Sequence, residues 1–307
     1  MKENTVRLTG PVIKTGIHEN PDGTQEVVCV MGVIRGFRHI GDGRENVKID
    51  RPVIMSRNQD MIDKIITWHK NDIVNIKGAV TSRTVMKEST CPFCKHKNYK
   101  EGLNTYVEPI FVEKLFTTQD DSSSVRYLNT IREISNEVKL FGSLTREPKK
   151  IKIRNGPVVT QYPLAVRRKF IIREDPPSVD TDFPWVKVYG TNALSDRERL
   201  RMSSQVYIDG ILQSRGINMK STCLHCGKVY EWKARALEIV PYETEYVKDY
   251  YTDEEVEENE KKRKALLLKS RGLDKFDLSI DLANYDDDEI TSEDIEAGID
   301  AFEEDDE

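Results

Sequence analysis

The chain has 307 residues, 37% hydrophobic and 33% charged, with a formal net charge of −6. This length allows two modest hydrophobic cores, and no window approaches the ~18 consecutive apolar residues that a membrane-spanning helix needs. The N-terminus lacks the apolar core of a signal peptide, and four of the five cysteines form C-x-x-C pairs rather than a secreted disulfide framework. We therefore expect a cytoplasmic protein without a membrane span.

Charge is unevenly distributed along the chain. Residues 252–307 contain 22 Asp/Glu and 7 Lys/Arg, a net charge of 7 − 22 = −15, so residues 1–251 carry −6 + 15 = +9. A basic body with an acidic end is typical of a protein whose folded part binds a polyanion. Apart from a charged helix that Asp253–Ser270 could form, we expect residues 252–307 to be a largely disordered tail, because they offer little apolar surface to bury.

Residues 1–116 predict a β-rich domain. Apolar–polar alternation indicates strands, and helical spacing indicates one short helix at Gln59–His69. The predicted strands are Val6–Ile13, Val27–Ile34, Val47–Met55, Ile73–Thr81 and Tyr106–Leu115. Residues 117–135, which include the turn-forming run Asp120–Ser124, are interpreted as a linker.

Residues 136–251 repeat this order of elements. The predicted strands are Val138–Leu144, Val158–Val166, Phe183–Tyr189, Val206–Gln213 and Trp232–Val240, with a helix at Leu194–Arg201. Asp72–Cys94 aligns without a gap on Ser204–Cys226, at an offset of 132 residues, and nine of the 23 columns are identical. One domain is therefore present twice. Its element order is that of an OB-fold, a five-stranded Greek-key barrel, so the predicted fold is two tandem OB-folds with C-x-x-C loops.

The cysteine pairs carry the clearest chemical signal. Zn²⁺ prefers four soft ligands in a tetrahedron, and each repeat supplies only two. A single four-cysteine site formed by Cys91 and Cys94 with Cys223 and Cys226 is the simplest arrangement. Two separate or intermolecular sites, or redox-active or free thiols, remain alternatives. Cys29, in an apolar strand, is interpreted as a buried small hydrophobe.

Cations and rings follow the second strand of each repeat. These residues are Arg35, Phe37 and Arg38 in the first repeat and Arg167, Arg168, Lys169 and Phe170 in the second. Such a pattern suits a nucleic-acid single strand, because cations track phosphates while rings stack on bases. An ordinary basic hairpin with a core-packed ring is the alternative. Trp185 lies on the same strand face as Phe183, and either stacking on a base or packing on the sheet would suit it.

Four blocks of the second repeat form a pattern: Asn136–Pro148, Leu164–Arg168, Gly190 with Ala193, and Val206–Arg215. In the identity and order of these blocks the second repeat resembles the bacterial single-stranded DNA-binding protein (SSB) family. The resemblance implies an OB-fold that binds single strands without reading their sequence, and it places the base-stacking aromatics of the family on Phe170, Phe183 and Tyr189. The first repeat is linked to the family mainly through its match to the second.

No catalytic motif stands out, so we expect a binding protein and not an enzyme. The expected function is to coat single-stranded DNA during replication, recombination or repair, and to recruit partner proteins through the acidic tail, with Ile299 and Phe302 as contacts. The source would be a bacterial cell, or a virus or plasmid within a host cell, and oligomerisation is compatible with the pattern. An RNA-binding or transcription-associated module and a protein-binding scaffold are the alternatives.

Overall fold

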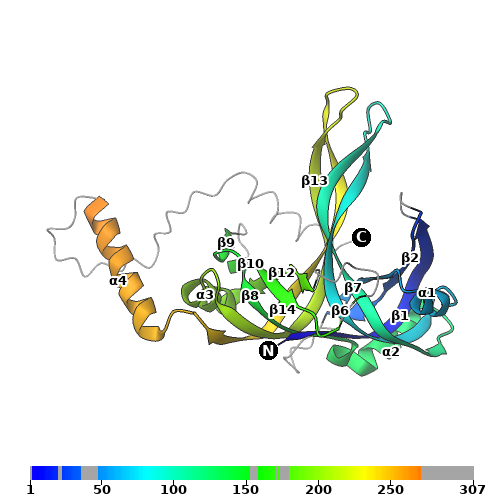
Figure 1. Ribbon diagram of the computed structural model, residues 1–307, viewed down its shortest axis with the longest axis horizontal. Helices are drawn as coiled ribbons and strands as arrows, with labels where there is room; N and C mark the ends of the chain where they lie inside the picture. Colours follow the sequence, from blue (N-terminus) through cyan, green and yellow to red (C-terminus); the bar gives the residue numbers. More distant parts are fainter. Residues whose placement is uncertain are drawn as a thin grey trace.

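Figure 1 shows the protein as a computed structural model, in which residues 2–19, 23–35, 48–152, 158–170, 172 and 180–270 are described. The two repeats form neighbouring β-barrels, and a pair of long hairpins projects from between them (Figure 1). The mainly β fold expected from the sequence is confirmed.

Five strands build the first barrel: β1 (Glu3–Glu19), β2 (Gln25–Met31), β5 (Val53–Ser56), β6 (Asp72–Thr90) and β7 (Lys97–Thr117). β1 pairs antiparallel with β2 and β6, β2 pairs with β5, and β6 pairs with β7. A parallel pairing of Ile54 with Val107 joins β5 to β7 and closes the barrel. Between β5 and β6 lies helix α1 (Gln59–Ile65), whose N-terminus is capped by Asn58. This is the strand order of an OB-fold.

The second barrel repeats the first with β8 (Asn136–Leu144), β10 (Val158–Arg167), β12 (Trp185–Tyr189), β13 (Gln205–Thr222) and β14 (Val229–Lys248). β8 pairs with β10 and β13, β10 pairs with β12, and β13 pairs with β14. A parallel pairing of Val186 with Ile239 closes it. Helix α3 (Gly190–Arg199) precedes β13. Four short strands complete the set: β9 (Lys149–Lys152) and β11 (Thr181–Asp182) pair with β10, and in the first repeat β3 (Val33–Ile34) pairs with β4 (Ile49–Asp50).

Antiparallel pairing of β1 with β8 joins the two barrels into one continuous sheet. Val6 pairs directly with Val138, its own counterpart at the 132-residue offset, so a pseudo-two-fold axis passes between these two residues. Buried asparagines obey the same symmetry. The Asn4 side chain makes two hydrogen bonds of 2.9 Å with the Val80 backbone, and that of Asn136 bonds the Leu212 backbone at 2.8 and 3.0 Å.

Two of the glycines shared by the repeats are required by close backbone approach. A Cβ atom on Gly78 would lie 2.4 Å from the carbonyl oxygen of Glu108, and one on Gly210 would lie 2.4 Å from that of Val240. Both glycines stand at register shifts where the fourth strand bends along the fifth. Any side chain at these points would force the strands apart.

The predicted third strands are interrupted. Val47–Met55 is divided into β4 and β5 around Pro52, and Phe183–Tyr189 is reduced to β12 by Pro184, because proline cannot donate a ladder hydrogen bond. The predicted fourth and fifth strands are much too short. β6, β7, β13 and β14 continue through the segments that the sequence analysis treated as cysteine loops.

The segment interpreted as a linker contains helix α2 (Asp121–Ile131) and a 3-10 turn, η1 (Arg132–Ser135). Asp120 caps α2 by accepting the Ser123 N–H at 2.7 Å, and Leu128, on the inner face of α2, is buried. The acidic segment begins with a charged helix, α4 (Asp253–Ser270), as the sequence suggested. Within the described residues, no helix combines the length and apolar character needed to cross a membrane. The predicted disorder beyond residue 270, and Ile299 and Phe302, lie outside those residues.

Candidate metal centre and nucleic-acid surface

Two β-hairpin arms bring the paired cysteines together. The first arm is the outer part of β6 and β7, and the second is the outer part of β13 and β14. The arms rise side by side from the junction of the barrels (Figure 1). Each ends in a C-x-x-C turn followed by a residue with positive φ, Lys95 at 61° and Gly227 at 69°. The two turns are built alike, because the N–H of each of these residues bonds the carbonyl of the first cysteine at 2.9 Å.

All four thiols meet at the arm tips. The Cys91 sulfur lies 3.7 Å from that of Cys226, and the Cys94 sulfur lies 3.5 Å from that of Cys223. The four sulfur atoms lie within 4.8 Å of one another. A tetrahedron with Zn–S bonds of about 2.3 Å has sulfur atoms about 3.8 Å apart, so the cluster has the size of a four-thiolate zinc site. Of the arrangements left open by the sequence, the structure shows the shared one.

A second layer of side chains crosses between the arms. Asn98 of the first arm accepts the Leu224 N–H at 2.9 Å and donates to the Cys223 sulfur at 3.6 Å. Tyr230, its counterpart in the second arm, shares a 2.7 Å hydrogen bond with Ser89. These contacts orient the ligands, as outer-shell groups do in metal sites. The sequence analysis missed both residues.

The thiol environments favour a bound cation. Burial alone would raise the pKa of Cys223, but N–H groups of Cys226 and His225 and the Asn98 amide stabilise its thiolate and hold its pKa at about 5. At Cys94 the His96 N–H acts in the same direction, but burial and the neighbouring sulfurs raise the pKa to about 12. Four thiolates at this spacing repel one another, and a divalent soft cation removes that repulsion.

Each arm is also tied at its base to the opposite barrel. In the second barrel, Arg168 forms a two-point ion pair with Asp182, at 2.5 and 2.9 Å, and the side chains are only 1% and 0% exposed. Asp182 also accepts the N–H of Ser82, in the first arm, at 2.9 Å, and the Ser82 hydroxyl accepts the Phe183 N–H at 2.8 Å. We call this set the arm clamp.

An equivalent clamp, related to the first by the pseudo-two-fold axis, holds the second arm. Arg35 binds Asp50 through two contacts of 3.0 Å, and Asp50 accepts the N–H of Ser214 at 2.9 Å. Arg35 and Arg168, both predicted to lie on the nucleic-acid surface, are thus held in the two clamps. Arg168 is buried, and both guanidinium groups are bound to a fully buried carboxylate. The sequence contains one indication of the clamps: Ser82 and Ser214 are identical residues at equivalent positions of the two repeats.

The other predicted nucleic-acid residues differ in exposure. Arg167 is exposed and pairs with Asp180 at 3.0 Å, and the ring of Phe183 is 45% exposed beside the base of the first arm. Phe170 and Trp185 are partly buried, and so is Tyr189, where burial raises the pKa to about 12. Phe37 and Arg38 lie outside the described residues.

Residues 135–231 match the sequence profile of the Single-strand binding protein family. The matched residues run from the start of β8 into β14 and make up most of the second barrel. The whole fold resembles the structure of wild-type single-stranded DNA binding protein from Thermus aquaticus, with a TM-score of 0.53 and 16% identity over 82% of this chain and 97% of that chain. A deletion mutant of the same Thermus protein gives a TM-score of 0.51, also at 16% identity, over 82% and 98% of the two chains. At this identity the likeness establishes a shared fold. No curated protein sequence matches the chain significantly.

The two barrels differ at the positions where the second barrel carries rings. At the 132-residue offset, Phe183 and Tyr189 correspond to Arg51 and Arg57. Arg57 pairs with Glu26 at 3.3 Å. At these two positions, therefore, the second barrel carries rings and the first barrel carries cations.

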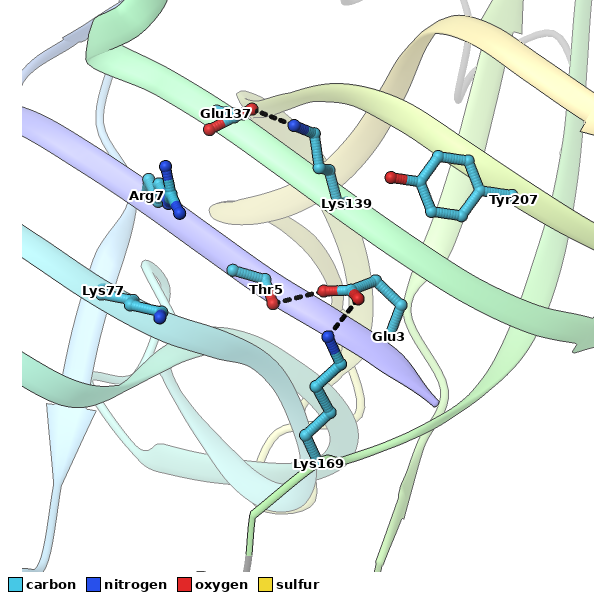
Figure 2. Close-up of a pocket in the computed structure, with 8 residues that line it drawn as sticks. All are labelled: Glu3, Thr5, Arg7, Lys77, Glu137, Lys139, Lys169 and Tyr207. Carbon is cyan, nitrogen blue, oxygen red and sulfur yellow. Dashed lines mark hydrogen bonds and ion pairs between the residues drawn. The ribbon is translucent and has the colours of Figure 1, made fainter. Parts of the chain in front are cut away.

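Lys169 of the second barrel lies at the junction with the first barrel. Figure 2 shows the pocket that it lines, of about 200 Å³, together with Glu3, Thr5, Arg7, Lys77, Glu137, Lys139 and Tyr207. Lys169 pairs with Glu3. Burial raises the pKa of Glu3, but the hydrogen bonds from Lys169 and Thr5 outweigh it and lower the pKa below its ordinary value. Four cations and two carboxylates give this pocket a net charge of 4 − 2 = +2.

Proposed function

We propose that the protein binds single-stranded DNA through its two OB-folds and coats it without reading its sequence. The observation that carries this proposal is the match of residues 135–231 to the Single-strand binding protein family. The exposed ring of Phe183 and the net charge of +9 on residues 1–251 suit a ligand with stacking bases and phosphates. Binding, not turnover, is the expected activity.

The role of the four cysteines in this function is to hold one Zn²⁺. Four thiolate donors at tetrahedral spacing, two of them buried, match the preference of zinc and offer no open position for catalysis. Bound zinc would supply a rigid crosslink between the arms, and through them between the two barrels. The four cysteines would supply the ligands, and the hydrogen bond from Asn98 would orient the Cys223 sulfur toward the metal.

We further propose that the protein acts in the cytoplasm during replication, recombination or repair, and that the acidic segment after residue 270 recruits partner proteins. The cytoplasmic location is supported by the C-x-x-C pattern, which suits a reducing compartment. Recruitment is supported by the apolar residues Ile299 and Phe302, which lie in a sequence rich in Asp and Glu and without Lys or Arg from residue 286 onward.

A titration with three polymers tests the DNA-binding proposal. Binding of zinc-loaded protein to oligo-dT, duplex DNA and poly-U is followed by tryptophan fluorescence at several salt concentrations. We expect the highest affinity for oligo-dT, with log K falling linearly as log[salt] rises because phosphate counterions are released. A preference for poly-U would favour the RNA-binding alternative. Equal affinity for duplex and single strand, or no binding, would refute the proposal.

A further inference from the structure

The arm tip, residues 89–100 and 221–230, has a surface that the metal site does not explain. Its exposed apolar side chains are Phe93 (57% exposed), Tyr99 (53%), Leu224 (84%) and Val229 (63%). Exposed apolar side chains that gather at one place and are bordered by polar groups mark interaction sites, whereas singly exposed ones are common on protein surfaces. The tip therefore has the character of a docking surface.

The charge of the tip points to an acidic partner. The two segments contain Lys95, Lys97, Lys100 and Lys228 and no Asp or Glu. Lys97 pairs at 2.8 Å with Glu88, which borders the first segment, so the lysines outnumber this neighbouring carboxylate by four to one. The Lys228 ammonium lies 4.6 Å from the centre of the Phe93 ring, and the His96 and His225 rings stack with centroids 5.4 Å apart. Apolar and cationic groups are thus interleaved on one surface.

The chain carries a segment with the complementary chemistry. Residues 286–307 contain 13 Asp/Glu and no Lys/Arg, with Ile290, Ile295, Ile299 and Phe302 spaced among them. The last three stand at intervals of four and three residues, the spacing that places side chains on one face of a helix. From Ser270 to Ile295 there are 25 residues, which can extend about 85 Å.

We propose that residues 286–307, from the same protein or a neighbouring copy, dock on the arm tip, with Ile295, Ile299 and Phe302 against Phe93 and Leu224. The acidic side chains face the lysines. Tethering raises the effective concentration of the segment to the millimolar range, so weak contacts suffice. Nucleic acid is the competing occupant. The aliphatic groups of Leu224 and Val229 favour the peptide, because they offer no flat surface on which a base can stack.

Photo-crosslinking of the full-length zinc-loaded protein tests this inference. p-Benzoylphenylalanine replaces Leu224, and the matched control carries it in place of Ile134, which is 69% exposed and lies in η1. After irradiation, peptide mass spectrometry locates the crosslinks. We expect crosslinks from position 224 to residues 286–307, at least fivefold more than from position 134, with a severalfold loss in 0.5 M NaCl as the charges are screened.

The double substitution Ile299→Ser and Phe302→Ser in the tail should reduce the yield in the same way, while zinc content and circular dichroism stay unchanged. Mixing isotopically labelled and unlabelled protein shows whether the tail docks on its own protein or on a neighbour, and either result supports the inference. No crosslink to residues 286–307, or an unchanged yield in the double variant, would overturn it. A crosslink to added oligo-dT without any tail crosslink in DNA-free protein would assign the tip to nucleic acid. These outcomes do not depend on whether the barrels bind DNA.

Discussion

The arm clamp allows a quantitative test, because the ion pair between Arg168 and Asp182 is almost completely buried. We consider Asp182→Asn, which keeps one oxygen to accept the Ser82 N–H. It removes the charge and replaces the oxygen that accepts from Arg168 Nε by an NH2 group. It leaves the Arg168 guanidinium buried without a countercharge. Removing one partner of a buried pair costs about 3–5 kcal/mol, and the retained amide oxygen places the expected loss near the lower end, about 3 kcal/mol.

The matched control is Asp180→Asn, two residues away. Asp180 also pairs with an arginine, Arg167, but the two side chains are 38% and 62% exposed. Solvent screens such a pair, so we expect a loss of less than about 1 kcal/mol. Thermal unfolding of the zinc-loaded proteins compares the variants, and about 3 kcal/mol corresponds to a fall in Tm of about 6–12 °C for a protein of this size.

The same variant should weaken metal retention, because Asp182 fixes the base of the first arm through Ser82. Competition with a chelator measures this effect separately from unfolding. The reasoning is refuted if Asp182→Asn lowers Tm no more than Asp180→Asn does. Retention of zinc at the wild-type level in a destabilised variant would show that the clamp stabilises the barrels without positioning the arm.

Three other consequences can be measured. Metal analysis should find one Zn²⁺ per chain, and Cys91→Ser should release it, because three remaining thiolates bind zinc more weakly than four. Phe183→Ala should weaken oligo-dT binding by about 1–3 kcal/mol without lowering Tm, since the ring is 45% exposed. Burial raises the pKa of Asp196 to about 6, so the folded protein holds this proton more tightly than the unfolded chain. The resulting stabilisation, about 3 kcal/mol, is complete below about pH 4 and is lost as the pH rises through 6, and Asp196→Asn should remove this part of the pH dependence.

Each of these expectations has a contrary result. Two metal ions per chain, or none, would contradict the shared site. Wild-type affinity of the Phe183→Ala protein, beside an unchanged Ile134→Ala control, would place the stacking surface elsewhere. For Asp196, whose carboxylate accepts hydrogen bonds from Tyr162 at 2.8 Å and Tyr246 at 2.7 Å, identical pH profiles of wild type and variant would show that the site stays ionised.

The sequence by itself determined the repeat, the OB-fold order and the SSB-family character of the second repeat. These properties are written in local patterns: strand alternation, the 132-residue offset, and blocks such as Val206–Arg215. Burial of Cys29 followed from the same alternation and is confirmed. Local patterns suffice here because a half-buried strand exposes every second side chain wherever it lies.

Only the tertiary structure decided that the two repeats contribute their cysteines to one cluster, and which arginines are bound to buried carboxylates. Cys94 and Cys223 meet because β1–β8 pairing relates the barrels by a pseudo-two-fold axis, and no local signal encodes that pairing. Ser82 and Asp182 are 100 residues apart in the chain, so no local stretch of sequence shows that the Arg168–Asp182 pair is buried at the base of the first arm. A strand pattern shows that a side chain points away from the barrel core, but the neighbouring domain decides whether that side chain reaches water.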